Sequence, residues 1–326
     1  MFNTTFSERV IMDQTAQVTS TILMIRPVAF RMNEQTAVNN YYQQRIRNLT
    51  AEEIQNQALQ EFDDFVNKLK EIGVDVIVVN DTLQPSSPDS IFPNNWISFH
   101  DNGNVVLYPM FAVNRRYERR MDILDMLKSK GFDIRHIIDL ATMESQDIFL
   151  EGTGSLILDR QNKLTYAAIS ERTHKEAVDI FSERFDYTPV VFHANQTVDG
   201  ERLPIYHTNV MMSIAEDFAI ICLDSIDDKN EREHVTQTIE KSGKEVIKIT
   251  EEQVSNFAGN MLQVQGANEE DYLIMSASAY NCLTKDQIAR IEAHCKIMYS
   301  NIDTIETLGG GSARCMMAEV FLPKKS

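Results

Sequence analysis

The sequence predicts a mixed α/β fold assembled from five copies of one small unit, in the order strand, strand, helix, strand. Helical patterns, with apolar residues every three or four positions, cover roughly residues 51–72, 114–130, 173–185, 228–242 and 284–297. Their starts recur every ~55 to 65 residues, a period long enough for a supersecondary repeat. Short runs rich in β-branched and aromatic residues lie before and after these helices. The period and this order of elements carry the fold prediction.

The predicted strands follow the same order along the chain. A pair of short strands is expected before each of the second to fifth helices, as in Trp96–Phe99 with Val105–Tyr108 and in Ser155–Leu158 with Leu164–Ala168. The turn signal Asp101-Asn102-Gly103 separates the first of these pairs. A further strand is expected after every helix, and these strands are Asp75–Val79, Asp133–Ile138, Thr188–Phe192, Glu245–Ile249 and Ile297–Ser300.

One unit is divided between the two ends of the chain. Thr21–Arg26 would open it, and Met316–Leu322 would supply the strand that closes a ring of five units around an axis. The period alone supports an ordinary mixed α/β sheet with a second domain equally well. Because no Pro/Gly/Ser-rich linker marks a boundary, we expect a single domain over 1–326, with 1–18 as an N-terminal extension. The long polar segment Pro27–Asn48 is a candidate lid over a site.

Composition excludes several classes of protein. The 326 residues are 43% hydrophobic and 24% charged, which is ordinary for a soluble globular enzyme. With 48 acidic against 31 basic residues, the formal charge of −17 removes the attraction on which nucleic-acid binding depends. No apolar stretch approaches the ~20 residues that span a bilayer. Met1–Ser20 is too polar for a signal peptide. We therefore expect neither nucleic acid nor a membrane as a partner.

Cysteine usage favours a reducing, cytoplasmic setting, because the four cysteines show no CxxC pairing. No paired His/Cys spacing predicts a metal site, and no glycine fingerprint predicts a bound nucleotide, so we expect no metal and no cofactor. Without local context, each cysteine would be a small buried hydrophobic residue. The four are Cys222, Cys282, Cys295 and Cys315.

The strongest local signal surrounds the last of these cysteines. In Leu308-Gly309-Gly310-Gly311-Ser312-Ala313-Arg314-Cys315-Met316, three consecutive glycines permit a tight turn or a close approach of a ligand to the backbone. A strand is expected to follow at once. Cys315 would then lie beside free backbone N–H groups and next to Arg314, which favours the thiolate form. The alternative is a turn with a core cysteine behind it.

Two further segments place polar residues just before predicted strands. A nucleophilic cysteine needs a proton acceptor and donor, usually histidine, and His207 stands in Tyr206-His207-Thr208-Asn209 ahead of an apolar run. Glu151 opens Glu151-Gly152-Thr153-Gly154-Ser155, where a carboxylate could bind the N–H groups of a planar ligand or cap the turn. Each residue alone has a structural explanation. Cys315, His207 and Glu151 each lie shortly before a predicted strand in a different unit. In a closed ring of units these three positions would lie close together near the axis.

These residues resemble the guanidine-modifying superfamily, also called amidinotransferase-like or pentein, which includes arginine deiminases and dimethylarginine hydrolases. Within it the sequence looks closest to the citrulline-utilisation hydrolases. The resemblance implies a five-bladed α/β propeller with pseudo-fivefold symmetry. It runs from about Thr19 to Pro323, and its motifs are Met24–Phe30, Phe92–Trp96, Phe149–Gly154, Tyr206–Asn209 and the cysteine loop.

The resemblance also implies roles for individual residues. Cys315 becomes the attacking thiolate and His207 the general acid/base, while Glu151 grips and orients the planar group of the substrate. Arg115 and Arg172 fall where related enzymes bind a substrate carboxylate, which the fork of a guanidinium suits. Considered alone, each arginine would be surface charge.

Departures from the family pattern bear on the substrate. Asn95 and Asn209 stand where arginine deiminases have aspartates, and Gly154 replaces an acidic residue. A buried guanidinium needs carboxylate partners, whereas a ureido group is neutral and carries one acceptor oxygen beside its N–H donors. The asparagine side chain can both donate to the ureido oxygen and accept from its N–H groups, but ionised aspartate only accepts. We therefore assign Asn94, Asn95 and Asn209 to substrate binding, and we expect the substrate to be L-citrulline.

The predicted reaction is hydrolysis of citrulline to ornithine, carbon dioxide and ammonia through a covalent thiocarbamate on Cys315. The first alternative is an arginine deiminase-like guanidine hydrolase, and an amidinotransferase would use the same covalent chemistry. A binding module on the same fold is the alternative from another class. A small amino acid is the expected partner, and homo-oligomerisation stays open.

Overall fold

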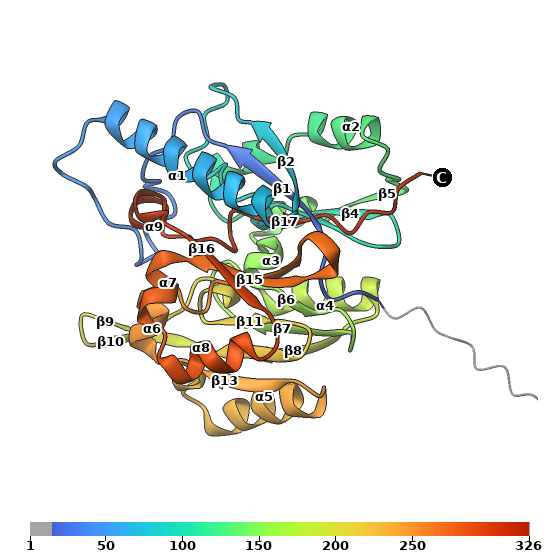
Figure 1. The fold of residues 1–326 in the computed structure, drawn as a ribbon, viewed down its shortest axis with the longest axis vertical. Helices are drawn as coiled ribbons and strands as arrows, with labels where there is room; N and C mark the ends of the chain where they lie inside the picture. Colours follow the sequence, from blue (N-terminus) through green and yellow to red (C-terminus); the bar gives the residue numbers. More distant parts are fainter. Residues whose placement is uncertain (1–14, 326) are drawn as a thin grey trace, which may run out of the picture.

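The computed structural model describes residues 15–325 and shows a mixed α/β fold (Figure 1). The N-terminal extension predicted over 1–18 lies outside the described residues as far as residue 14. The described β-structure consists of five three-stranded sheets and one two-stranded hairpin. The strands are β1 (Thr21–Arg26), β2 (Asp75–Asn80), β3 (Ile97–Phe99), β4 (Asn104–Leu107), β5 (His136–Asp139), β6 (Ile157–Asp159), β7 (Leu164–Ala168), β8 (Thr188–Phe192), β9 (Asn195–Val198), β10 (Glu201–Pro204), β11 (Met212–Ile214), β12 (Phe218–Ile221), β13 (Glu245–Lys248), β14 (Leu262–Gln265), β15 (Asp271–Ser276), β16 (Lys296–Ser300) and β17 (Ala318–Glu319).

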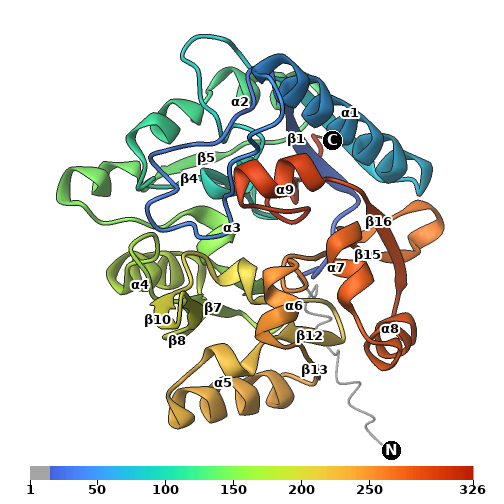
Figure 2. The same cartoon turned by 90° about the vertical axis from the view of Figure 1, so that its left-hand side faces the viewer.

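The helices occupy the positions between these strands. They are α1 (Ala51–Glu71), α2 (Asp122–Ser129), α3 (Gly152–Ser155), α4 (Lys175–Phe185), α5 (Lys229–Lys241), α6 (Glu251–Ser255), α7 (Ala277–Cys282), α8 (Lys285–Glu292) and α9 (Asp303–Gly309). Figure 2 shows α1, α2, α4, α5 and α8 around the outside of the molecule, with α3 and α9 nearer its middle. No helix in the described part of the chain is long and apolar enough to cross a membrane.

Each three-stranded sheet has the same arrangement. Its middle strand pairs antiparallel with one neighbour and parallel with the other, and a helix separates the two parallel strands along the chain. A parallel pair requires such a crossover, since a short turn cannot return the chain in the same direction. The predicted unit of strand, strand, helix and strand is therefore present in all five sheets. Their strand orders are β17-β1-β2, β3-β4-β5, β6-β7-β8, β11-β12-β13 and β14-β15-β16.

The sheet divided between the chain ends forms as the sequence predicts. β1 pairs in parallel with β2, with Thr21 opposite Asp75, and antiparallel with β17, with Leu23 opposite Ala318. β17 covers only Ala318–Glu319, so it is shorter than predicted. Within residues 15–325 no strand pairing joins one three-stranded sheet to the next, so these sheets do not form one closed sheet.

The second predicted helix, 114–130, is replaced by two shorter elements. A 3-10 helix, η2 (Val113–Glu118), comes first, and α2 begins only at Asp122. Side chains three residues apart lie on the same side of a 3-10 helix. This geometry lets Arg115 and Glu118 both turn into the protein interior, where they form an ion pair. The apolar spacing of α2 conceals that change of helix type in the sequence.

The amphipathic pattern of α1 explains how one outer helix docks. Thr50 and Glu53 form a capping box that satisfies N–H groups at its start. The buried face of α1 packs against β16, α9 and the strands of the first sheet. Burying such a face stabilises the fold by roughly 25 cal/mol per Å² of apolar surface. That face consists of Ala58, Phe62, Phe65, Val66 and Leu69.

One short turn before the first strand of each sheet brings the polar residues of interest together. The 3-10 helix η1 (Pro93–Asn95) precedes β3, α3 precedes β6, and η4 (Thr208–Val210) precedes β11. The turn at 257–260 precedes β14, and the turn at 312–316 precedes β17. Because α3 contacts both η1 and η4, side chains from separate sheets meet in the middle of the molecule.

Candidate active site

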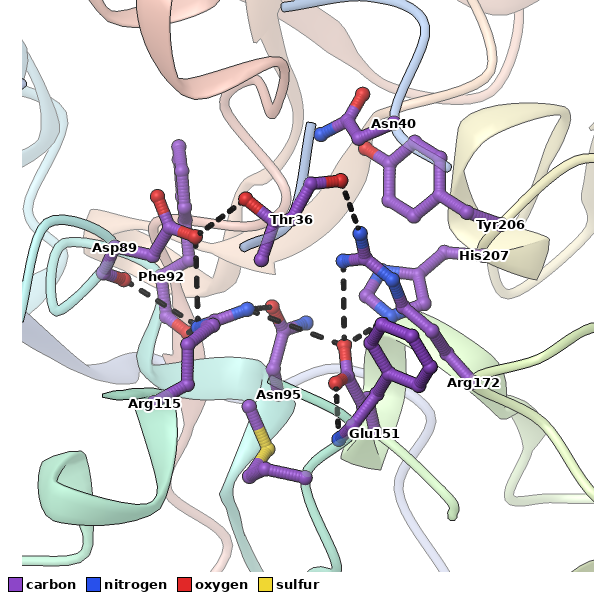
Figure 3. A network of polar contacts seen from close by, with 12 residues as sticks. Thr36, Asn40, Asp89, Phe92, Asn95, Arg115, Glu151, Arg172, Tyr206 and His207 are labelled. Atoms are coloured by element: carbon purple, nitrogen blue, oxygen red, sulfur yellow. Dashed lines mark hydrogen bonds and ion pairs between the residues drawn. The ribbon is translucent and has the colours of Figure 1, made fainter. Parts of the chain in front are cut away.

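A small cavity lies where these turns meet. Cys315 and His207 both line it, and Glu151 lies directly behind His207. The three residues that the sequence predicts to act together are therefore neighbours. The cavity is lined by Asn40, Asp89, Phe92, Asn95, Arg115, Arg172, Tyr206, His207, Gly309, Gly311 and Cys315, and Figure 3 shows most of these side chains.

Glu151 and His207 form a buried pair. His207 Nε2 lies 2.7 Å from Glu151 Oε2, and the backbone N–H of Phe111 donates to Glu151 Oε1 at 3.0 Å. A carboxylate only accepts, so Nε2 must carry the hydrogen of the neutral ring, and Nδ1 keeps its lone pair. We expected Glu151 to grip the substrate directly. In the structure it orients the imidazole, and both of its oxygens already accept hydrogen bonds.

Burial sets the protonation of this pair. Burial lowers the pKa of His207 to about 4, although the adjacent carboxylate works in the opposite direction. Burial would raise the pKa of Glu151, but Arg172, His207 and Arg115 together hold that pKa well below its ordinary value. At neutral pH the histidine is therefore neutral and the glutamate ionised. A neutral imidazole with a free Nδ1 can accept a proton from a thiol or a water molecule.

The sulfur of Cys315 is held by two side-chain amides. Asn209 Nδ2 donates to Sγ at 3.3 Å, and Asn260 Nδ2 donates to it at 3.2 Å. The preceding glycines allow the loop to pack closely. Gly310 adopts φ +62°, and a Cβ on it would lie 2.5 Å from Asn40 Nδ2. Gly310 therefore forms a tight turn, which is one of the two uses predicted for the glycines, and it also packs closely against the Asn40 side chain.

Two details of this loop differ from the prediction. A helical turn at 312–316 separates Cys315 from β17, so the strand does not follow at once. The guanidinium of Arg314 donates to the carbonyl of Met317 at 2.9 Å and to Glu319 at 2.7 Å. Its charge is therefore paired on the far side of the turn. Neighbours in sequence on a tight turn point in different directions, which composition alone does not reveal.

Arg115 is buried and bound to protein acceptors. Its Nε and Nη2 donate to the two carboxylate oxygens of Glu118, each at 2.9 Å, and Nη1 donates to Asn95 Oδ1 at 2.7 Å. The donors that we expected to bind a substrate carboxylate therefore contact the protein in this structure. A guanidinium only donates, so the Asn95 atom that faces it must be the oxygen.

This contact determines which way the Asn95 amide faces. With Oδ1 on Arg115, Nδ2 donates to Asn94 Oδ1 at 3.0 Å and keeps a second N–H. Nδ2 also lies close to Gly154, where a Cβ would come within 2.5 Å of it and within 2.8 Å of His207 Nδ1. The acidic residue that the family pattern places at this position would collide with both groups. Glycine at position 154 thus lets Asn95 and His207 approach each other.

Arg172 is equally buried, and it binds the segment Pro27–Asn48. Its Nε donates to Asn39 Oδ1 at 2.9 Å, and Nη2 donates to the same oxygen and to the Thr36 carbonyl at 2.8 Å. Nη1 lies 3.6 Å from Glu151 Oε2. Figure 3 shows Thr36 and Arg172 facing each other above the cavity. The candidate lid therefore covers the site and occupies the donors that we assigned to a substrate carboxylate.

Two residues at the site were not predicted from the sequence. Asp89 lines the cavity and is 2% exposed, and its Oδ1 is buried with no hydrogen-bond partner among the described residues. Asp89 Oδ2 accepts from Asn33 and Thr36. Asn260 contacts the nucleophile. A signal existed for each, because Asp89 lies shortly before the Phe92–Trp96 motif and Asn260 lies just before a strand.

Within residues 15–325 no group of three or more His, Cys, Asp or Glu side chains is arranged to hold a metal ion. Asn94 and Asn209 lie just outside the cavity wall. Asn94 Nδ2 and Asn209 Oδ1 are buried without a hydrogen-bond partner among the described residues. The eight predicted site residues are thus brought into one region, with Asn94 and Asn209 behind its surface.

The solved structures that resemble this chain carry the same fold. ArgZ, an arginine dihydrolase from the ornithine–ammonia cycle in cyanobacteria, superposes with TM-score 0.71 at 19% identity over 93% of this chain and 41% of that chain. AgrE in complex with ornithine and NAD+ gives TM-score 0.70 at 17% identity, over 94% and 40%. This chain therefore spans about two fifths of either protein. The N-terminal domain of ArgZ alone is matched over 99% of its length.

A third likeness comes from a dimethylarginine dimethylaminohydrolase variant captured as an adduct with S-methyl-L-thiocitrulline. It gives TM-score 0.60 at 12% identity, covering 93% of this chain and 99% of that chain. A search among curated proteins by sequence returned no match. The family model described as eukaryotic N,N dimethylarginine dimethylhydrolase matches residues 26–322. The chain therefore belongs to that family, within the guanidine-modifying or pentein superfamily.

Proposed function

We propose that this protein is a cysteine-dependent hydrolase that cleaves a C–N bond in the planar guanidino or ureido group of a free amino acid. The observation that carries the proposal is the meeting of Cys315, held by two amides, with His207, held by Glu151, at one small cavity. Covalent catalysis by a thiol needs an adjacent base and a third group that orients the base. Here the base is His207 and the orienting group is the Glu151 carboxylate.

The proposed reaction runs in two stages. His207 Nδ1 takes the proton of the Cys315 thiol, and the thiolate attacks the central carbon of the planar group. The imidazolium then gives that proton to the departing nitrogen, which leaves a covalent adduct on sulfur. In the second stage His207 takes a proton from water, and the resulting hydroxide releases the adduct and restores the thiol. Glu151 stabilises the imidazolium in both stages, as a buried carboxylate does in related acid–base pairs.

The guanidino group is the better supported substrate class. The matching family is that of a dimethylarginine hydrolase, ArgZ is an arginine dihydrolase, and the third similar structure is a dimethylarginine dimethylaminohydrolase. Asp89 offers a buried, unpartnered carboxylate oxygen at the cavity, which suits the N–H groups of a cationic ligand. Arginine would give citrulline and ammonia in one hydrolysis, or ornithine, carbon dioxide and two ammonia in two. This favours the alternative that the sequence placed second to citrulline.

L-Citrulline stays a second candidate because of one specific contact. Arg115 fixes Asn95 Oδ1, so the group that Asn95 has left for the cavity side is an N–H donor. A guanidinium has no acceptor for that donor, whereas a ureido oxygen accepts it. Citrulline hydrolysis would give ornithine, carbon dioxide and ammonia.

A comparison of substrates tests both hypotheses. Purified protein is supplied separately with L-arginine, L-citrulline and dimethylarginine, and ornithine, citrulline and ammonia are quantified. The guanidine reading predicts consumption of arginine or dimethylarginine, and the ureide reading predicts ornithine from citrulline with arginine untouched. Asn95→Asp is the informative variant, since it replaces the donor by an acceptor. It should lower kcat/KM for a ureide by at least about 100-fold relative to a guanidine. If neither compound class is consumed by the unmodified protein, the proposed activity is wrong.

We also propose a propeller fold, a lid over the site and a reducing cytoplasmic setting for this protein. Five three-stranded sheets of one pattern, each with a short turn before its first strand, support a five-bladed α/β propeller in a single domain. The contacts of Asn39 and Thr36 with Arg172 support a lid role for Pro27–Asn48. The four cysteines are unpaired, as a catalytic thiol in a reducing cytoplasm requires.

A further inference from the structure

We infer that Asn260 is a catalytic residue that, together with Asn209, stabilises the Cys315 thiolate that forms when His207 takes the thiol proton. The inference rests on the nucleophilic role proposed for Cys315 and deepens it. Both amides donate to Sγ, at 3.2 Å from Asn260 and 3.3 Å from Asn209. Hydrogen bonds that donate to a charged atom are roughly twice as strong as neutral ones, so two such donors favour the ionised sulfur.

The orientation of the Asn260 amide is fixed by its other contacts. Its Oδ1 accepts from the backbone N–H of Arg314 at 3.0 Å, and Nδ2 donates its second hydrogen to the Asn209 carbonyl at 3.0 Å. Reversing the amide would set an oxygen against the Asn209 carbonyl and an N–H against the Arg314 N–H. Neither arrangement forms a hydrogen bond. The side chain is 1% exposed, so water does not replace these partners.

The backbone conformation around Asn260 positions its side chain at the sulfur. Phe257 adopts φ +61°, a conformation that costs energy for an aromatic residue. A Cβ on Gly259 would lie only 2.3 Å from the Val210 carbonyl, so a side chain there would push this turn away from η4. Such strain persists only where the surrounding structure enforces it. Here it places Asn260 between η4 and the cysteine loop.

Asn260 also fills a gap in the pattern of the five sheets. The turn before the first strand of each sheet supplies a polar group to the site, namely Asn95, Glu151, Asn209 and Cys315 in four of them. Asn260, two residues before β14, is the contribution of the remaining sheet. The site therefore draws on all five three-stranded sheets.

No cation donates a hydrogen bond to Sγ among the described residues. Arg314 is paired with Glu319, Arg115 with Glu118, and Arg172 contacts Glu151 and the lid. The neutral His207 adds no positive charge while its pKa is held low by burial. Two amide dipoles thus do what an adjacent cation does in other thiol enzymes. The titratable and charged groups around the sulfur are Asp89, Arg115, Glu151, Arg172, Tyr206, His207 and Arg314.

Alkylation by iodoacetamide tests this without any substrate. The thiolate attacks the reagent, forming an S–C bond while iodide leaves, so the rate follows the ionised fraction. The rate at Cys315 is measured from about pH 5 to about pH 10 by mass spectrometry of its peptide, with Cys315→Ser as the background. Asn260→Ala and Asn209→Ala should each move the midpoint upward by about one pH unit, a roughly tenfold slower reaction below it. Asn260→Asp, which can still accept from Arg314, should move it further.

Asn256→Ala is the matched control, because Asn256 lies four residues earlier, is exposed, and its side chain donates to the Glu252 carbonyl and not to the sulfur. Its midpoint should equal that of the unmodified protein. An unchanged midpoint in a folded Asn260→Ala variant overturns the inference. If the Asn260 variants do not fold, the unmodified protein labelled with 15N-asparagine decides. The chemical shifts of two side-chain amides should change with pH at the alkylation midpoint and stay constant in Cys315→Ser. Fewer than two such signals would contradict the inference. A midpoint sensitive to Asn260, without turnover of any tested amino acid, would refute the proposed function alone.

Discussion

His207 Nε2 and Glu151 Oε2 lie 2.7 Å apart in an interior where neither side chain is more than 2% exposed. Replacing Glu151 by Gln keeps the shape but removes the charge that orients and supports the imidazole. We expect kcat to fall roughly 10³- to 10⁴-fold, as when the acid of a catalytic triad is neutralised, with binding of the amino acid less affected. Steady-state kinetics of Glu151→Gln measures this.

A matched control for that variant is Glu144→Gln. Glu144 pairs with Arg119 at 2.6 Å and accepts from the Met110 backbone, but it does not line the cavity. Its loss should change the melting temperature and leave kcat within a factor of about three, as expected of a residue away from reacting atoms. Equal loss of kcat in both variants would show that the effect of Glu151 is structural.

The depressed pKa of His207 predicts how stability depends on pH. In the folded protein burial lowers this pKa to about 4 from the ordinary 6.5. Between these values the unfolded chain binds a proton that the folded chain does not, so stability falls as pH falls through this window. At pH 5 the loss from this residue is about 2 kcal/mol. Urea unfolding of the unmodified protein and His207→Asn at several pH values isolates it.

The difference between the two proteins in the slope of unfolding free energy against pH isolates His207, because other groups titrate in the same pH range. Burial raises the pKa of Glu306 to about 7, which makes the folded state bind more protons in the same range. That contribution is common to both proteins and cancels in their difference. The slope of unfolding free energy against pH should therefore be less positive in His207→Asn than in the unmodified protein between about pH 4 and about pH 6.5. Identical slopes would mean that His207 is protonated equally in both states.

Gly154 is predicted to be intolerant of any side chain. In Gly154→Ala the new Cβ would lie 2.5 Å from Asn95 Nδ2 and 2.8 Å from His207 Nδ1, so both groups must move. Overpacking of this kind costs about 1–3 kcal/mol, and displacement of a catalytic group can cost about 100-fold in rate. Turnover and thermal unfolding are the two measurements. Gly200→Ala is the control, because it is strained by φ +86° but has nothing within 4 Å, and it should keep its turnover.

Asn39 is predicted to fasten the segment Pro27–Asn48 over the site. Its Oδ1 accepts from Arg172, and its Nδ2 donates to Glu171 at 2.7 Å. In Asn39→Ala the segment should open more often, with trypsin cleavage at its arginines several-fold faster. KM should rise about tenfold, equal to the loss of roughly 1.4 kcal/mol, with kcat changed less. Glu34→Ala breaks only an exposed ion pair with Arg45 and should match the unmodified protein. Unaltered cleavage in Asn39→Ala would remove the lid interpretation.

Much of the fold could be predicted because apolar spacing reports burial directly. The repeating unit was visible in that spacing, and α4 and α5 lie within two residues of their predicted bounds. The hairpin β9–β10 was not predicted, since its mostly exposed strands have no apolar alternation, although Asp199-Gly200 is a turn signal. The sequence predicts an α-helix where η2 lies. The 3-10 conformation of η2 accompanies the burial of its ion pair, which depends on tertiary contacts that the sequence pattern does not show.

The candidate site was predictable only where its residues belong to a motif. Cys315, His207 and Glu151 stand in glycine-rich or polar turns before strands, and the structure brings them together. What the sequence could not show is direction. Arg115 turns to Glu118 and Asn95, and Asn260 reaches the sulfur from a turn without any motif. Those contacts depend on segments far apart along the chain.

The most direct test of the account is to trap the covalent intermediate. The protein is mixed with L-arginine or L-citrulline, quenched in acid within the first turnover, and digested for mass spectrometry. The proposed mechanism predicts a mass increase on the peptide that carries Cys315 and no such increase in Cys315→Ser. From L-arginine the increase equals arginine less ammonia, and from L-citrulline it equals citrulline less ammonia if ammonia leaves first or a carbamoyl group if ornithine leaves first. Turnover by the Cys315→Ser protein at the rate of the unmodified one, or an adduct on another residue, would contradict it.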